Sequence, residues 1–390
     1  MRHGGSRLIA AFLVAMVVMV VCTSREAGAY TVKEFSNGGF LNIDYQVQAR
    51  EAWRGIGSGT DGTDSTQDFY LRRNRLSFLG AVNDTFGFAL QLEYNGGQRI
   101  GDLSVAADDS KYEMKVLDAY LTATVSNALQ IRAGKTKHIL TREVQEGCFD
   151  PLSADRSLFI NGPFKDKRTR DNGLVAFGNL HNDMFQYRLA VMQGNNFGNN
   201  KPSDIGYRYS GRAHVSLFDP ESGFGYRGSY LGKKKVLTLG AGYEVESSAV
   251  YASGTTGAQD YKAYTYDVFY ENPTDFGVFT VSAAYLKEDF GEAGMRGVVD
   301  AQGIDGEKNG YYWKAAYMIG KFQIFERYEN WSFAELNGVI GQKIKWTASG
   351  INYYIKGQDL RVTLEFSKND FSDAASRDFR TMIVQVQARF

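Results

Sequence analysis

Basic side chains are concentrated in particular parts of this 390-residue chain, although it has 44 basic and 44 acidic residues in total. The segment 135–170 carries eight Lys or Arg residues against five Asp or Glu residues. Other arginines fall on the polar face of segments with an alternating pattern. Low-dielectric walls focus the field of such charges, so a narrow passage lined by Arg and Lys attracts anions. The candidate anion-attracting, pore-lining residues are Arg73, Arg75, Arg132, Lys135, Lys137, Arg142, Arg188, Arg208 and Arg212.

A second interpretation of the same arginines stays open. Carboxylates occur on the same polar faces, at Glu93, Asp118, Glu244 and Asp267. If each arginine pairs with one of them across a water-filled interior, the pairs brace a wall and confer no selectivity. The sequence does not decide between an attracting ring and a salt-bridged wall.

Catalytic, cofactor and metal chemistry find little support. The segment Gly223–Gly228, "GFGYRG", fits Gly-x-Gly-x-x-Gly, but no helix and no suitably spaced acidic residue follow it. Cys148 and His138 lack a third, orienting group. The four histidines are scattered without metal-ligand spacing. We therefore predict no enzyme activity, no bound cofactor and no metal site.

The N-terminus has the features of an export signal. Arg2 and Arg7 precede the apolar run Leu8–Val21, and small residues at Ala27–Ala29 form a cleavage site. The run is too short for a membrane-spanning helix. We predict a signal peptide over residues 1–29 and a mature domain over residues 30–390. A lipoprotein anchored on Cys22 is the alternative, but Val21 stands where a small residue is expected.

The mature chain is slightly acidic and rich in aromatic residues. Removal of the signal takes away three basic residues and one acidic residue, leaving two more acidic than basic residues. This balance argues against nucleic-acid binding. With 24 Tyr, 26 Phe and 43 Gly but 5 Pro, the composition favours many strands, tight turns and aromatic belts.

Apolar and polar residues alternate along most of the mature chain. In the C-terminal segment 380–390, "RTMIVQVQARF", every second residue back from Phe390 is apolar. Segments 40–49, 86–94, 207–217 and 360–367 repeat the pattern, which is typical of strands with one apolar face. The connections between such segments alternate between short turns and long polar loops. Seven short and eight long connections predict sixteen strands.

This arrangement is typical of a bacterial outer-membrane barrel, with short periplasmic turns and long external loops. A soluble β-sandwich or propeller also has short alternating strands, but it does not explain the alternating loop lengths. Closure also pairs every backbone group within hydrocarbon. We predict an all-β, 16-stranded antiparallel transmembrane β-barrel with both mature termini in the periplasm. The closing strand ends at Phe390, which resembles the signal recognised by the barrel-assembly machinery.

Several segments resemble the phosphate-selective porin O/P family. They include "FYLRRNRLSFLGAVNDTFGFALQLEYNGG" (69–97), "LDAYLTATVSNALQIRAGKTKHILTREV" (117–144) and "INYYIKGQDLRVTLEFSKND" (351–370). The most specific parts are the paired arginines of the second predicted strand and the block Asp118–Lys137. The resemblance implies a sixteen-stranded homotrimeric porin whose inward-folded third external loop narrows the pore. The family's phosphate-binding lysines and arginine ladder cannot be assigned to residues of this chain, because the loops that carry them do not match.

The predicted function is passive diffusion of small polar solutes across the outer membrane, with a preference for anions such as phosphate or similar oxyanions. Outer-membrane lipid and lipopolysaccharide would surround the barrel. The alternative is a barrel sheath around a multihaem cytochrome in an electron conduit. The chain has no Cys-x-x-Cys-His motif, so the haems would belong to that partner. The third long connection, residues 137–170, is long enough to obstruct a threaded protein, which favours the porin.

Overall fold

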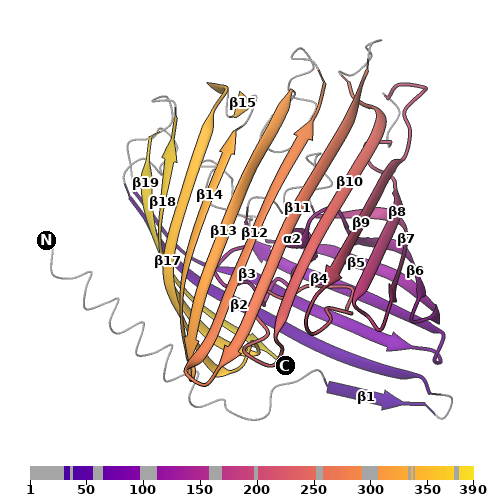
Figure 1. Ribbon diagram of the computed structural model, residues 1–390, viewed down its shortest axis with the longest axis horizontal. Coiled ribbons are helices and arrows are strands. Elements are labelled where there is room, and N and C mark those ends of the chain that lie inside the picture. The colour runs from indigo at the N-terminus through magenta and orange to yellow at the C-terminus, as the bar shows by residue number, and fades with distance from the viewer. Residues whose placement is uncertain are drawn as a thin grey trace, which may run out of the picture.

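The strands of this protein form one closed antiparallel barrel in the computed structural model (Figure 1). The structure describes residues 30–35, 38–55, 65–96, 112–157, 169–196, 201–251, 258–291, 306–332, 335–336, 339–372 and 377–390. The predicted signal peptide lies outside these residues. The sixteen barrel strands are β2 (Phe40–Arg54), β3 (Thr66–Ala81), β4 (Phe86–Gly96), β5 (Tyr112–Ser126), β6 (Leu129–Lys137), β7 (Arg170–Leu180), β8 (Phe185–Met192), β9 (Arg208–Ser216), β10 (Val236–Val250), β11 (Gln259–Thr274), β12 (Gly277–Asp289), β13 (Glu307–Ile319), β14 (Phe322–Ser332), β17 (Lys343–Lys356), β18 (Leu360–Phe371) and β19 (Phe379–Arg389).

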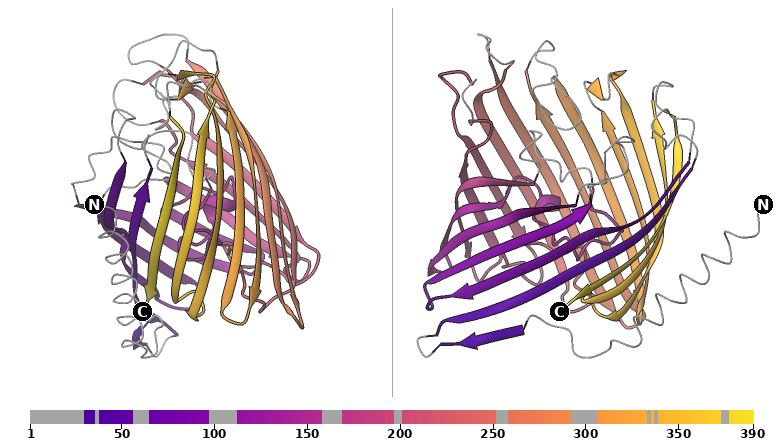
Figure 2. Two further views of the ribbon diagram at one scale, coloured as in Figure 1. Left: turned by 90° about the vertical axis from the view of Figure 1, so that its left-hand side faces the viewer. Right: turned by 180° about the vertical axis from the view of Figure 1, so that it is seen from behind.

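Each barrel strand pairs with the next one along the chain, and the last strand closes the ring against the first. In the closing pair of β19 and β2, Val386 lies opposite Ala49. Two short additional strands, β15 (Glu335–Leu336) and β16 (Val339–Ile340), lie between β14 and β17 in the chain and pair with each other. In the barrel, β14 pairs directly with β17. A further strand, β1 (Tyr30–Glu34), runs along the start of β2. The two views in Figure 2 show β2–β5 and β11–β14 on opposite sides of the ring. The predicted sixteen-stranded barrel is confirmed.

The alternation of side chains explains why the strands close in this way. Along β11, the buried Tyr261, Ala263 and Thr265 alternate with the more exposed Tyr264 and Tyr266. The exposed set forms an apolar, aromatic outer surface, while the inner set includes polar and charged groups. Closure pairs the backbone of every strand on both sides, which is the condition for crossing hydrocarbon.

Helix contributes little to the described structure. The one helix among the described ranges, α2 (Arg142–Gln145), has four residues, and none there is long and apolar enough to cross a membrane. Its N-cap is Thr141, whose side chain accepts a hydrogen bond from the Val144 N–H at 3.1 Å. The helix lies within the ring of strands (Figure 1), and all four of its residues are buried.

Candidate functional site

The described part of the third long connection, residues 138–157, lies inside the barrel, and we call it the strap. It leaves β6 at His138, forms α2, and continues in a largely irregular conformation past Cys148. Nearly all of its side chains are buried. Arg156 donates to the carbonyls of Val144 and Glu146 at 3.1 and 3.3 Å, which satisfies backbone acceptors at the end of α2. The strap is therefore a compact element rather than a loose loop.

Side chains of the barrel wall hold the strap through its backbone carbonyls. Gln387 donates to the Phe149 carbonyl at 2.9 Å, and Arg361 donates to the Pro151 carbonyl at 2.8 Å. Further bonds of 2.7 to 2.9 Å join Asn352 to Leu152, Arg50 to Ala154, and Arg327 to Asp155. These donors come from β19, β18, β17, β2 and β14, so residues 149–155 of the strap are fastened to one side of the wall.

Charged groups fasten the same segment more strongly. The Asp155 carboxylate contacts Arg50 at 2.5 Å and Arg72 at 3.0 Å, and all three side chains are almost fully buried. Burial raises the pKa of Asp155, but Arg50 and Arg72 outweigh it and hold that pKa far below its ordinary value. Within α2, Glu143 forms a buried ion pair with Lys314 of β13.

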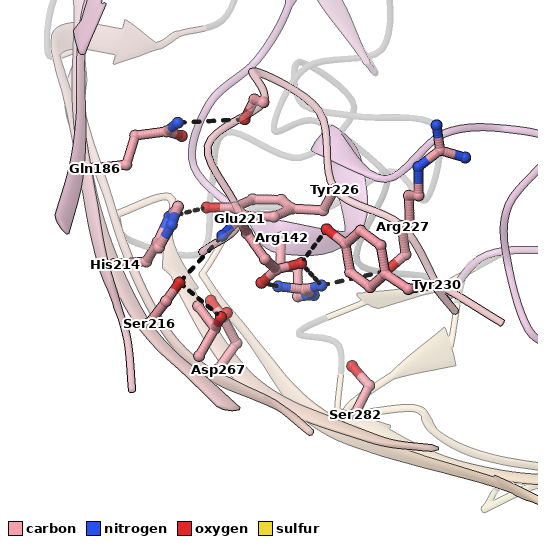
Figure 3. A network of polar contacts seen from close by, with 12 residues as sticks. Arg142, Gln186, His214, Ser216, Glu221, Tyr226, Arg227, Tyr230, Asp267 and Ser282 are labelled. Atoms are coloured by element: carbon pink, nitrogen blue, oxygen red, sulfur yellow. Dashed lines mark hydrogen bonds and ion pairs between the residues drawn. The ribbon is translucent and has the colours of Figure 1, made fainter. Parts of the chain in front are cut away.

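A second segment enters the lumen from the opposite end of the barrel. Residues 217–235 connect β9 to β10, and we call them the inward turn. Glu221 receives two hydrogen bonds of 2.7 Å from Arg142 of the strap, and the Tyr230 hydroxyl donates to it at 2.7 Å (Figure 3). Burial raises the pKa of Glu221, but the Arg142 guanidinium outweighs this and lowers that pKa to about 2. Strap and inward turn are thus joined by a buried bidentate pair.

The glycine pattern rejected as a dinucleotide site lies in the inward turn. A side chain on Gly228 would meet the Asp150 carbonyl oxygen at 2.5 Å and Pro151 Cα at 2.9 Å. Gly228 is therefore needed for the close approach of the turn to the strap. The alternating pattern predicts residues 218–233 only as one of the seven short connections. A sign of a further role is that this turn is rich in aromatic residues, at Phe224, Tyr226 and Tyr230.

Tyr226 is the centre of this contact (Figure 3). Its hydroxyl oxygen lies 2.5 Å from Arg188 Nη1, 3.1 Å from Arg212 Nε and 2.7 Å from His214 Nδ1. The guanidinium groups of Arg142 and Arg188 each lie 4.4 Å from its ring centre. A phenol oxygen of the protein itself thus occupies a point where basic groups of β8 and β9 converge.

Four of the nine candidate residues are paired with carboxylates. Arg75 contacts Glu93 at 2.5 Å, and Arg212 makes two bonds of 2.7 and 2.9 Å to Asp267. Arg208 contacts Glu246 at 3.0 Å, and Arg142 is held by Glu221. For Arg75, Arg208 and Arg212 the geometry is that of the salt-bridged wall, whereas the Arg142–Glu221 pair joins the strap to the inward turn.

Three further candidates are engaged by the protein or lie outside the lumen. Arg73 donates to Gln48, and Arg188 donates to the Tyr226 hydroxyl and to the Phe224 carbonyl. Lys135 lies opposite Ala119, in the same phase as the exposed Leu121, and its Nζ donates to the Val116 carbonyl at 2.7 Å. The structure therefore places Lys135 on the outer face of the barrel. Lys135 was expected to line the pore because it lies next to the third long connection in the sequence, and that position does not show that its side chain points outward.

Arg132 and Lys137 are the two remaining candidates, and they face a cavity of about 230 Å³. It lies between the wall of β3–β6, Gln145 of the strap, and Phe224 and Gly225 of the inward turn. Lys137 donates to the Glu146 carbonyl at 2.9 Å. The Arg132 guanidinium lies 3.8 Å from the ring centre of Phe224 and 4.5 Å from that of Tyr120. Within the described ranges no ion pair engages either cation, and the cavity's acidic residue, Asp118, is paired with Arg170 at 3.0 Å.

Comparison with known proteins identifies the family. The family model for phosphate-selective porin O and P matches residues 54–390. This chain belongs to that family. No curated protein sequence matches the chain significantly.

Solved porin structures share the fold of this porin at low sequence identity. The anion-selective porin from Comamonas acidovorans is 12% identical with a TM-score of 0.58, over 90% of this chain and 100% of that chain. The outer membrane channel DcaP of Acinetobacter baumannii is 12% identical with a TM-score of 0.57, over 93% and 100%. The trimer form of OmpT of Vibrio cholerae is 14% identical with a TM-score of 0.51, over 90% and 99%. The chain is thus a β-barrel porin of the outer membrane.

We expect Asp155→Asn to destabilise the porin by about 3 to 5 kcal/mol, because it leaves Arg50 and Arg72 buried without a counter-charge. Urea unfolding in detergent, followed by tryptophan fluorescence, measures the loss. The matched control is Glu307→Gln, since Glu307 also pairs with a cation, Lys287, but their side chains are 52% and 29% exposed, and an exposed pair contributes at most about 1 kcal/mol. Equal losses in the two variants would contradict the anchoring role of Asp155.

Proposed function

We propose that this porin is a passive diffusion channel for small polar solutes with a preference for anions. The observation that carries the proposal is the cavity at Arg132 and Lys137, where two cations face open space without a carboxylate of their own. Most other lumenal arginines are neutralised by the wall or tied to the strap. Arg73 and Arg188 also lack a carboxylate partner, but they are bonded to Gln48 and Tyr226, so Arg132 and Lys137 are the candidate cations that line the cavity.

The charge balance around the cavity supports the sign of the preference. Arg132, Lys137 and Arg170 contribute three positive charges, and Asp118 contributes one negative charge. In a narrow, low-dielectric surrounding such an excess lowers the energy of an entering anion and raises that of a cation. The anion-selective porin from Comamonas acidovorans has a similar fold, which agrees with this sign.

The arrangement of the lumen argues against the sheath around a cytochrome. Side chains of β2 and of β19 bind the strap. The inward turn contacts the strap from the other end of the barrel. A threaded protein would have to displace both segments and break buried ion pairs. No observation favours the sheath, so we propose the diffusion channel alone.

Assembly in the membrane follows from the same proposal. We infer export by the cleaved signal, periplasmic termini and a homotrimer surrounded by outer-membrane lipid and lipopolysaccharide. The trimer form of OmpT supports the oligomer, and a mass measurement in mild detergent tests it.

Phe390 pairs with Tyr45 through backbone bonds of 2.9 and 3.1 Å and remains 44% exposed. We propose this terminal ring as the contact for the barrel-assembly machinery, and deletion of Phe390 should lower the amount of folded barrel in the membrane.

The experiment that tests the channel is the zero-current potential of the purified mature porin in a planar bilayer with a KCl gradient. We expect the sign that corresponds to chloride permeating faster than potassium. A potential of the opposite sign would refute the anion preference and leave the fold unaffected.

A further inference from the structure

The cavity at Arg132 has a charged end and an apolar side. Lys137, Arg132 and Thr136 come from one strand, β6, and Gln91 and Gln145 add neutral polar groups. Asp118 also lines the cavity, and its carboxylate is paired with Arg170 at 3.0 Å. The apolar side is formed by Leu79, Ala89, Tyr120, Phe224 and Gly225. About 230 Å³ corresponds to roughly eight water molecules at about 30 Å³ each. The space therefore suits a small solute that is charged at one end and apolar along its body.

The setting of Arg132 fixes which of its atoms can bind a solute. Phe224 lies close to the guanidinium at 3.8 Å, with Tyr120 at 4.5 Å and Phe177 at 5.3 Å. Among the described residues no hydrogen bond reaches this guanidinium, and its Nε is buried without a partner. The rings are held by the wall and by the inward turn, so the cation is kept in place by stacking rather than by a counter-ion. Its N–H groups remain available as a planar fork, which matches the two oxygens of a carboxylate.

An inorganic tetrahedral anion fits this site less well. Phosphate needs donors on several sides once it is removed from water, and an unsatisfied charged oxygen is costly. Leu79, Ala89 and the ring of Phe224 offer none. An apolar body that covers these three side chains removes apolar surface from water, which is favourable.

We propose that the cavity is a binding site for small monocarboxylates with a flat, apolar body, and this proposal rests on the anion pathway proposed above. The carboxylate binds Arg132 and Lys137, and the body lies against Leu79, Ala89 and Phe224. Phe224 is a specificity-determining residue, since it both stacks on the cation and forms part of the apolar side. The inward turn thereby contributes directly to solute choice.

Block of the chloride current by added anions tests the proposal. Benzoate, acetate and phosphate are compared on the wild-type porin in a planar bilayer at equal ionic strength. We expect benzoate to block at a concentration at least tenfold lower than either acetate, which lacks the body, or phosphate. Equal block by phosphate and benzoate would overturn the solute class while leaving the anion preference intact. A cation-selective zero-current potential would instead refute the channel proposal itself.

Variants of one strand and of the inward turn locate the site. Arg132→Gln should raise the half-blocking concentration of benzoate at least tenfold, and Phe224→Leu should raise it several-fold while small-ion conductance persists. Lys135→Gln is the matched control, because it removes a charge from the same strand on the outer face, and it should leave the block unchanged. If benzoate blocks the Arg132→Gln variant at the same concentration as the wild type, Arg132 is not part of the binding site and the proposed site is refuted. If that variant does not insert, the comparison of three anions on the wild type still decides the solute class.

Discussion

Replacing residues 220–234 by Asn-Gly should raise the single-channel conductance of this porin several-fold. The Asp219 N–H already donates to the Lys235 carbonyl at 2.8 Å, and a two-residue Asn-Gly turn can join strands that are paired in this way. The excision removes Phe224, Tyr226 and Glu221 from the lumen and leaves β9 and β10 intact. Conductance is set by the narrowest open section, so emptying one end of the lumen widens the path.

A matched control separates this effect from a general disturbance of the turn. Arg227→Gln changes a side chain of the same segment that is 46% exposed, and we expect wild-type conductance from it. The excised variant should also lose its preference for benzoate, because Phe224 is gone. An excised porin that inserts and conducts like the wild type would show that the inward turn lies off the solute path.

Much of the barrel follows from local pattern, because strand alternation and turn length are properties of short segments. In β19 the half-exposed Met382 and Val386 lie on the predicted outer face, and Arg73 and Arg75 are buried on the lumenal side. Arg72 could not be assigned in the same way. The register of β2 and β3 shifts at Gln48, so a β-bulge turns both Arg72 and Arg73 inward.

The site was harder to predict, because it depends on contacts between distant segments. Glu93 and Asp267 were correctly foreseen as possible partners of arginines, yet the choice between pairing and attraction depended on three-dimensional distances. The partner of Arg142 is Glu221, 79 positions away and in a segment expected to be a simple turn. Arg361 illustrates a missed signal: it lies on the polar face of an expected strand, and it binds the strap.

The second large effect concerns the charge of the cavity. Arg132→Glu combined with Lys137→Glu changes its surroundings from three cations and one carboxylate to one cation and three carboxylates. We expect the preference to invert, because the field acts where the path is narrow and poorly screened. Lys135→Glu makes the same kind of change on β6 but on the outer face, so it should keep the wild-type preference.

The zero-current potential of this double variant, measured in a KCl gradient beside the wild type and Lys135→Glu, tests the central claim most directly. We expect the cation-selective sign for the double variant and the anion-selective sign for the other two porins. That result would show that the cavity at Arg132 and Lys137 is the selective section of the pore. An anion-selective sign for all three porins would contradict it, and would place selectivity elsewhere in the lumen.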